Sequence, residues 1–402
     1  MARARNIERQ SAALRSQGLE QVTITTFLDG IARRAESNDP RGPAARVFLT
    51  VLALMGFGLL VQASHAATAM TAEGFRSQLL TEVVMRVGGI ATMLFAFQLG
   101  PKGIRRFLPF AMVVVGVLLV AVFIPGVGSP RNGSNRWVEL LGVSFQPSEL
   151  ARIVLVVWIA DRCVRLGHRV YDWRRGVMPM LAVVFAYFSL VLIETDLGGS
   201  MLLLICALST MWVGGARALP MAASLVAAGG GAITALTLLV PYVRNRVAMW
   251  FGTVSNNQVD STMGALESGG LIGAGMGRGA LRTSGVPHLQ SDYAFAQIGE
   301  EFGYLGLLIV LGLVIALLWN GLRLVLSLRD RFEALAVFGL LISVGLQAML
   351  HMQVVAGLAP PKGTTLPFIS DGGSSLLVSS LAVGMALGPA RRRAQELNSC
   401  NP

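Results

Sequence analysis

Charged side chains are scarce in this sequence. Asp, Glu, Lys and Arg make up 14% of its 402 residues, whereas hydrophobic residues make up 53%. A soluble domain carries about 25% charged residues, so a chain of this composition cannot cover a globular surface with polar groups. The mean hydropathy of +0.62 agrees with this. The composition therefore excludes a cytosolic enzyme, a secreted disulfide scaffold and a disordered tail protein, and it predicts a polytopic membrane protein.

Cysteine and lysine are also rare. The three cysteines, Cys163, Cys206 and Cys400, have no metal-ligand spacing, and we interpret them as structural thiols. Among the 33 basic residues only Lys102 and Lys362 are lysines, and the net charge is +11. A basic excess is typical of nucleic-acid binding, but membrane proteins also hold positive charge in their cytoplasmic loops. We therefore expect no nucleic-acid partner.

The apolar residues are gathered into about ten segments that could cross a bilayer, which takes about 20 helical residues. The fourth segment is short and carries Glu149 and Arg152. Because helices are the only open-chain structure that satisfies backbone polar groups in lipid, the expected fold is all-α. The segments are residues 46–64, 82–100, 107–125, 148–163, 177–194, 198–215, 220–240, 301–319, 333–355 and 373–390.

The polar ends of the chain predict its orientation. Residues 1–45 are Arg-rich and lack the apolar core of a cleavable signal peptide. We expect them to be a regulatory or docking tail, although Arg there would also set the topology. Residues 46–390 form the expected membrane domain and residues 391–402 a second tail. Most Lys and Arg fall on the termini and on the loops of the same side, which places both termini in the cytoplasm of an inner-membrane protein.

One connection is unusually long. Residues 241–297 join the seventh and eighth segments on the outer face and are rich in glycine, yet they remain apolar. A disordered loop would be more polar, and structureless loops beyond about 15 residues are uncommon. We expect this loop to pack as short helices and turns at the outer membrane surface.

Ionisable residues inside the apolar segments are candidates for function, because each costs a few kcal/mol in lipid. Glu149 and Arg152 are three residues apart, so they share a helix face and can form a pair. That pair would be functional or would only lock the helices together. Asp196 is either functional or the N-cap of the next helix. Glu82 and Arg86 are interpreted as structural.

Gln347 and His351 lie four residues apart in the ninth segment. A histidine on an apolar face is most often a core residue whose polar atoms are satisfied within the protein. We therefore interpret His351 as part of the core.

Three polar clusters stand at the ends of apolar segments. In the first, Pro147 suits the first turn of a helix. In the second, glycines, hydroxyls and a nearby lysine could hold phosphate through backbone N–H groups, although such a stretch also describes an ordinary loop. The third ends at Asp292. This residue would either take part in the reaction or only stabilise a helix N-terminus by its charge. The candidate residues of the first two clusters are Arg136, Gln146, Ser148, Glu149, Arg152, Lys362, Ser370, Gly372, Gly373, Ser374 and Ser375.

Taken together, these clusters and their order resemble the SEDS family, the shape, elongation, division and sporulation proteins of the FtsW and RodA type. The resemblance covers about residues 46–390. Lys362-Gly363 before the Ser-Gly-Gly-Ser-Ser-like stretch is closer to the FtsW division branch than to the RodA branch. The matching stretches are Arg136-Trp137, Phe145-Gln146-Pro147-Ser148-Glu149-Leu150-Ala151, Asp196-Leu197-Gly198, Ser268-Gly269-Gly270-Leu271, Asp292, Ile298-Gly299-Glu300-Glu301-Phe302-Gly303, Lys362-Gly363, Leu366-Pro367-Phe368-Ile369-Ser370 and Gly372-Gly373-Ser374-Ser375.

The resemblance implies a peptidoglycan glycosyltransferase. Such a protein polymerises lipid II into glycan strands on the outer face of the membrane, with a class B penicillin-binding protein as partner. The growing strand is carried on undecaprenyl pyrophosphate. The aspartate that ends the outer loop is catalytic in the family, and here it is Asp292. We expect Asp292 to face a cavity shared with residues 148–163, 333–355 and Ser370–Ser375.

The resemblance also implies how charge is handled. Asp292 would act as general base, while Arg152, Lys362 and either Arg244 or Arg246 would offset the leaving-group charge. Glu149 would hold Arg152, and a divalent cation, Mg²⁺ or Mn²⁺, is left open as a helper. A lipid II flippase and an inactive scaffold that recruits the penicillin-binding protein are the alternatives.

Two departures from the family pattern bear on chemistry. Arg152 stands where the family usually has Lys, and Asp371 stands where it usually has Tyr. Either change could alter the activity, and together they keep the scaffold alternative open.

Overall fold

The computed structural model describes residues 39–69, 72–131, 134–140, 143–251, 257–281 and 289–399. The predicted N-terminal tail therefore lies almost wholly outside the described residues, as does Cys400. The long helices are α3 (Arg41–Ala69), α4 (Ala72–Arg105), α5 (Leu108–Ala121), α6 (Pro147–Leu166), α7 (Met178–Ile193), α8 (Leu197–Val213), α9 (Ala218–Leu239), α13 (Ala294–Leu326), α14 (Arg331–Val355) and α15 (Gly373–Ser399).

Each predicted apolar segment coincides with one of these helices, so the helical fold is confirmed. Seven helices are long and apolar enough to cross a membrane, and α5 and α8 are shorter apolar helices. How many of the ten helices cross the membrane stays a prediction.

Helix starts follow from the local sequence. Pro147 occupies the first turn of α6, where its missing N–H costs nothing. Asp196 caps α8, since its carboxylate accepts the backbone N–H of Gly199 at 2.7 Å. Asp330 caps α14 in the same way through the N–H of Glu333. Short polar side chains thus satisfy the orphan N–H groups at these helix ends.

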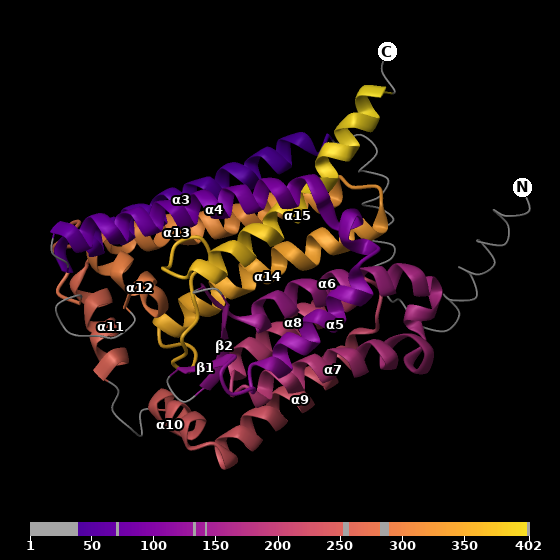
Figure 1. Cartoon of the computed structure of the whole chain (residues 1–402), viewed down its shortest axis with the longest axis horizontal. Coiled ribbons are helices and arrows are strands. Elements are labelled where there is room, and N and C mark those ends of the chain that lie inside the picture. Colours follow the sequence, from indigo (N-terminus) through magenta and orange to yellow (C-terminus); the bar gives the residue numbers. More distant parts are fainter. Residues whose placement is uncertain are drawn as a thin grey trace, which may run out of the picture.

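The helices lie roughly parallel or antiparallel in two groups (Figure 1). Helices α3, α4, α13 and α15 form one group, and α5 to α9 form the other. Helix α14 lies between them and packs on α6, α8, α13 and α15. Buried side chains of α14 such as Phe332 and Leu340 therefore belong to a core shared by both groups.

A small antiparallel sheet follows α5 and was not predicted. Its strands are β1 (Gly128–Arg131), β2 (Ser134–Leu140) and β3 (Val143–Phe145), with Trp137 paired to Ser129 and Val138 paired to Phe145. The expectation of helices alone was incomplete here, because outside the apolar segments backbone groups can pair between strands. The sheet leads directly into α6.

The long loop contains the expected short helices, α10 (Pro241–Trp250), α11 (Asn257–Ser268) and α12 (Leu289–Asp292). After α11 the chain runs against α13, and the N–H groups of Ala274 and Gly275 bond to the carbonyls of Glu300 and Glu301. Gly303 kinks α13 at this contact with φ of 66°, a conformation that favours glycine. Helices α10 to α12 and the sheet all lie at the end of the molecule away from the C-terminus (Figure 1).

Candidate active site

A cavity of about 690 Å³ brings together residues from segments far apart in the sequence. The predicted lining from α6, α14 and the start of α15 is present, since Ser148, Gln347 and Gly373 all border it. Most of the predicted site residues line this cavity: Arg136, Gln146, Ser148, Glu149, Arg152, Asp196, Arg246, Asp292, Lys362, Gly372, Gly373 and Ser374. The sequence clusters therefore converge on one space.

Three predicted residues do not line the cavity. Arg244 is exposed on α10. Ser370 accepts the backbone N–H of Leu366 at 2.8 Å, so it shapes the turn before α15. Ser375 accepts a hydrogen bond from Gln347 at 3.1 Å and belongs to the wall behind the lining. Of Arg244 and Arg246, only Arg246 lines the cavity. Its guanidinium also donates to the carbonyl of Pro361 at 2.7 Å.

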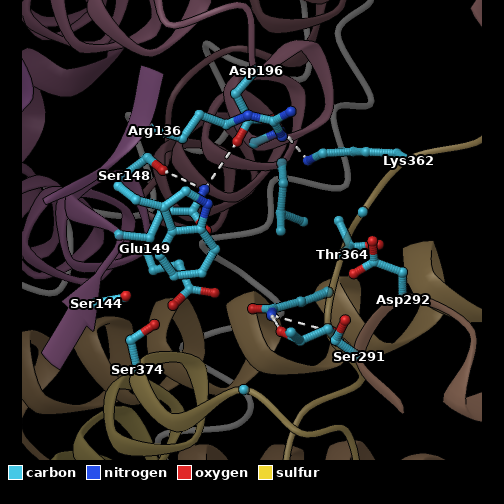
Figure 2. Close-up of a pocket in the computed structure, with 18 of the residues that line it drawn as sticks. Arg136, Ser144, Ser148, Glu149, Asp196, Ser291, Asp292, Lys362, Thr364 and Ser374 are labelled. Atoms are coloured by element: carbon cyan, nitrogen blue, oxygen red, sulfur yellow. Dashed lines mark hydrogen bonds and ion pairs between the residues drawn. The ribbon is translucent and has the colours of Figure 1, made fainter. Parts of the chain in front are cut away.

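Asp196 is the charged centre of one side of the cavity (Figure 2). Its carboxylate lies 2.9 Å from the ammonium of Lys362 and 3.8 Å from the guanidinium of Arg136. Gln146 donates to it at 3.1 Å. Asp196 also caps α8, so its structural interpretation is confirmed, while its part in the function stays a prediction.

Burial and charge act in opposite directions on Asp196. Its side chain is 1% exposed, and burial alone would raise its pKa. Lys362 and Arg136 outweigh that effect and hold the pKa of Asp196 well below its usual range. A carboxyl group with a lowered pKa is ionised at neutral pH, so Asp196 carries the negative charge that faces Lys362 and Arg136.

Asp292 lies at the end of α12 and faces the segment that carries Lys362. Figure 2 shows it beside Thr364, across the cavity from Glu149. Asp292 Oδ2 lies so close to Gly363 that a Cβ atom added to this glycine would be only 2.6 Å from Oδ2. The pair Lys362-Gly363 therefore has two roles, because the lysine binds Asp196 and the glycine leaves room for Asp292.

That close approach yields a test. Gly363→Ala should displace the Asp292 carboxylate while leaving the helices in place, since the obstructed atom is the end of a side chain. A misplacement of about 1 Å can cost 10²-fold in rate, so kcat of any reaction that uses Asp292 should fall by about that factor. Gly56→Ala, where an added Cβ has no neighbour within 4 Å, is the matched control. Equal kcat values in the two variants would contradict a role for this contact.

The predicted direct pair between Glu149 and Arg152 was wrong. Arg152 donates instead to the side-chain oxygen of Gln347. Within the described residues no ion pair joins Glu149 to Arg152, although the two charges are close enough to interact electrostatically. Glu149 is 9% exposed, and its Oε2 has no hydrogen-bond partner in the described part of the chain. The two residues share a face of α6, but Arg152 is bound to Gln347 and not to Glu149.

Gln347, singled out in the sequence only by its spacing from His351, joins several side chains in the cavity wall. Its amide nitrogen donates to Ser375 at 3.1 Å and to the hydroxyl of Thr365 at 3.2 Å, while its oxygen accepts from Arg152. An uncharged amide gives a weaker sequence signal than an ionised group, but its burial cost in lipid could have identified it. His351 is buried, as expected, and contacts the carbonyl of Thr364.

The coupling free energy between Arg152 and Gln347 can be measured by a double-mutant cycle. Arg152→Leu and Gln347→Leu should each destabilise the protein, because a buried hydrogen bond to a charged group is worth about 1.5–3 kcal/mol. The double variant should lose less than the sum by about 1 kcal/mol or more, read from thermal unfolding in detergent. Additivity within about 0.5 kcal/mol would show that the two side chains are not coupled.

A second unpredicted residue, Gln62 of α3, fixes the segment before Asp292. Its amide donates to the carbonyl of Gln290 at 3.1 Å and to that of Ile369 at 3.3 Å. The backbone N–H of Asp371 bonds to the same Gln290 carbonyl. Like Gln347, it is a buried amide in an apolar helix.

The ion pair of Arg86 with Glu82 is structural, as predicted. Arg86 also donates to the carbonyl of Met55, so the pair ties α4 to α3. Asp371 lines the cavity nearby and accepts a hydrogen bond from Gln78 at 3.3 Å. The second departure from the family pattern therefore places a carboxylate in the cavity.

The fold and the site define a polytopic membrane protein with a charged cavity at one end of its helices. The family described as "Cell cycle protein", which groups FtsW, RodA and SpoVE, matches residues 44–394. The chain belongs to this family, and the resemblance found from the sequence is confirmed.

Individual relatives match over most of their length. "Stage V sporulation protein E" of Bacillus subtilis (strain 168) is 32% identical over 308 residues, which are 75% of this chain and 84% of that protein. "Probable peptidoglycan glycosyltransferase FtsW" of Aromatoleum aromaticum is 32% identical over 379 residues, 90% of each chain.

Solved structures share the fold. The crystal structure of the rod shape determining protein RodA of Thermus thermophilus superposes with a TM-score of 0.64 at 24% identity, covering 86% of this chain and 96% of RodA. A chain from a structure described as "Structural coordination of polymerization and crosslinking by a peptidoglycan synthase complex" superposes with a TM-score of 0.70 at 24% identity, covering 87% and 98%.

Proposed function

We propose that this protein is a peptidoglycan glycosyltransferase that polymerises lipid II at the outer face of the cytoplasmic membrane. The observation that carries the proposal is the convergence of Asp292 with Arg136, Arg152, Arg246 and Lys362 on one cavity. Relatives named probable peptidoglycan glycosyltransferase FtsW support it. The match to FtsW proteins and the Lys362-Gly363 pair favour a role in cell division.

The location limits the chemistry. Outside the cell ATP and NAD(P)H are absent, so the substrate must carry its own activation. A polyprenyl pyrophosphoryl sugar does so, because its pyrophosphate is a leaving group. The donor is then the growing glycan on undecaprenyl pyrophosphate, and lipid II is the acceptor.

Asp292 acts as the general base in this mechanism. Its carboxylate takes the proton of the acceptor sugar hydroxyl, whose oxygen attacks the anomeric carbon of the donor. A new C–O bond forms, the bond to the pyrophosphate oxygen breaks, and the anomeric configuration inverts. A positioned general base contributes about 10²–10⁴ in rate.

The basic side chains of the cavity stabilise the departing pyrophosphate. Arg152 is 6% exposed, and its Nε has no hydrogen-bond partner within the described residues. Glu149 Oε2, on the same helix, is also buried without a hydrogen-bond partner among the described residues. Buried polar atoms normally have partners, and both residues line the cavity, so their other side-chain atoms are the ones placed to contact a substrate. Preorganised charges of this kind need no reorganisation when the leaving group departs.

Whether a divalent cation could be held by this protein depends on the ligands that its side chains offer. Among the described residues no three His, Cys, Asp or Glu side chains lie close enough to hold a metal ion. The described part of the chain thus offers no clustered ligand set for a resident Mg²⁺ or Mn²⁺, and the proposed mechanism has no step through one. Arg152 and Lys362 carry the charge stabilisation in the proposed mechanism.

A class B penicillin-binding protein is the proposed partner. The structure that shares this fold with a TM-score of 0.70 was determined for a peptidoglycan synthase complex in which polymerisation and crosslinking are coordinated. A transpeptidase at the same outer face would receive each strand as it forms. With both termini in the cytoplasm, the proposed topology puts the cavity at the outer face of the membrane.

The test is polymerisation by the purified protein with labelled lipid II and its penicillin-binding protein. We expect glycan strands, resolved by gel electrophoresis after lipid release. Transbilayer movement of lipid II in proteoliposomes without any polymer would favour the flippase instead. Failure of both reactions, with the partner still bound, would favour the scaffold.

A further inference from the structure

A second cavity lies at the other end of the helices from the candidate active site. It has a volume of about 330 Å³ and lies between the first turns of α3, the second half of α4 and the C-terminal half of α15. Figure 1 shows the C-terminal end of α15 on the side of the molecule away from α11, α12 and the strands. We call this cavity the α3–α4–α15 groove.

The walls of the groove are apolar. Met93 is fully buried at its base, whereas the Leu94 side chain is 47% exposed where the groove opens to the outside of the bundle. The groove therefore opens on the surface that the helices present to lipid. Its apolar lining residues are Ala44, Ala45, Phe48, Met93, Leu94, Phe97, Leu387 and Ala390.

Two arginines complete the lining, Arg41 at the start of α3 and Arg391 near the end of α15. They come from different helices, yet both border the same small volume. Arg41 lies 3.8 Å from Asp39 in an exposed pair, which is worth little in water. Arg391 is exposed and makes no hydrogen bond or ion pair in the part of the chain that the structure describes.

Neighbouring basic residues are neutralised within the protein. Arg392 bonds to Glu333 at 3.0 Å, and Lys102 bonds to Asp330 at 2.8 Å. Glu333 and Asp330 are thus directed to those two cations and not to Arg391. The charge of Arg391 remains available at the opening of an apolar groove.

We propose that the α3–α4–α15 groove is a binding site for an anionic phospholipid. One acyl chain lies against Phe48, Met93 and Phe97, and the headgroup phosphate is bound by Arg41 and Arg391. Guanidinium groups suit phosphate because they donate in a planar fork. A zwitterionic lipid carries an ammonium group that opposes the two arginines, so the site selects a headgroup of net negative charge.

The test uses the full chain in phosphatidylcholine nanodiscs that contain a photoreactive lipid. Two probes share one diazirine-bearing acyl chain, and their headgroups are phosphatidylglycerol and phosphatidylcholine. After irradiation, mass spectrometry should find the phosphatidylglycerol probe on peptides that include Met93, Phe97 and Leu387. Arg391→Gln should lower that labelling by about fivefold, and Arg41→Gln with Arg391→Gln by more.

Two further variants separate charge from shape. Arg323→Gln removes an arginine that stacks on Trp319 near the same end of the bundle but does not line the groove, so labelling should be unchanged. Ala45→Trp should block the opening and reduce labelling by both probes. Equal labelling by the two probes, no groove labelling by either, or no effect of the double arginine variant would overturn the proposal. Because the readout is lipid attachment, it is independent of polymerisation and of the proposed function.

Discussion

Asp292→Asn should abolish polymerisation of lipid II while leaving the protein folded. The asparagine has the same shape and still accepts a hydrogen bond, so the contact with Gly363 is kept. Its amide cannot take the proton of the acceptor hydroxyl, and the rate should fall by about 10²–10⁴. Asp292→Glu keeps the base but moves it, which should cost about 10²-fold. Strand synthesis per mole of purified complex is the measurement.

A matched control for this experiment is Glu267→Gln. Glu267 is an exposed carboxylate on α11, in the same loop as Asp292 but outside the cavity. It should polymerise lipid II at the wild-type rate. Unfolding temperature and binding of the penicillin-binding protein should be the same for all variants. Near-normal synthesis by Asp292→Asn would remove Asp292 as base and revive the flippase alternative.

The second large effect is expected at the pair of Lys362 and Asp196. Removing one partner of a buried ion pair costs about 3–5 kcal/mol, because the other charge is left without compensation. The stability lost in Lys362→Met should be near the low end of that range, because Arg136 still lies 3.8 Å from Asp196 and partly compensates its charge. The loss should appear as a lower unfolding temperature in detergent and as lost synthesis.

The other lysine of the chain provides the comparison. Lys102 lies 2.8 Å from Asp330, almost the distance of Lys362 from Asp196, but both side chains are more than a third exposed. Lys102 also lies 3.4 Å from the buried carboxylate of Glu333, but Arg392 remains 3.0 Å from that carboxylate when Lys102 is removed. Exposed ion pairs contribute about 0–1 kcal/mol, so Lys102→Met should have a small effect.

The double variant Asp196→Asn with Lys362→Met tests whether the charge itself matters. It should be more stable than Lys362→Met alone, because it leaves no stranded carboxylate. It should nevertheless remain inactive, because the proposed mechanism uses Lys362 to stabilise the leaving group. Stability losses that simply add would show that the two side chains are independent.

Much of the site could be predicted because its residues break a local rule. Arg152, Asp196 and Lys362 are charges in or beside apolar segments, and such charges are conspicuous in any hydropathy pattern. Asp292 was found differently, through the motif order that the family shares. The roles of Gln62 and Gln347 were missed because an uncharged amide costs less to bury than an ionised group and is therefore a weaker signal of function. Their importance lies in which distant groups they join.

The sequence by itself determined the helical membrane fold, the positions of the ten helices and the family. These depend on composition, segment length and residue order, which are local properties of the chain. Only the tertiary structure decided that Arg152 binds Gln347 and not Glu149, that Lys362 reaches Asp196, and that a small sheet precedes α6. The reason is that helical periodicity gives the face on which a side chain lies, while the packing of distant helices decides which side chain it meets.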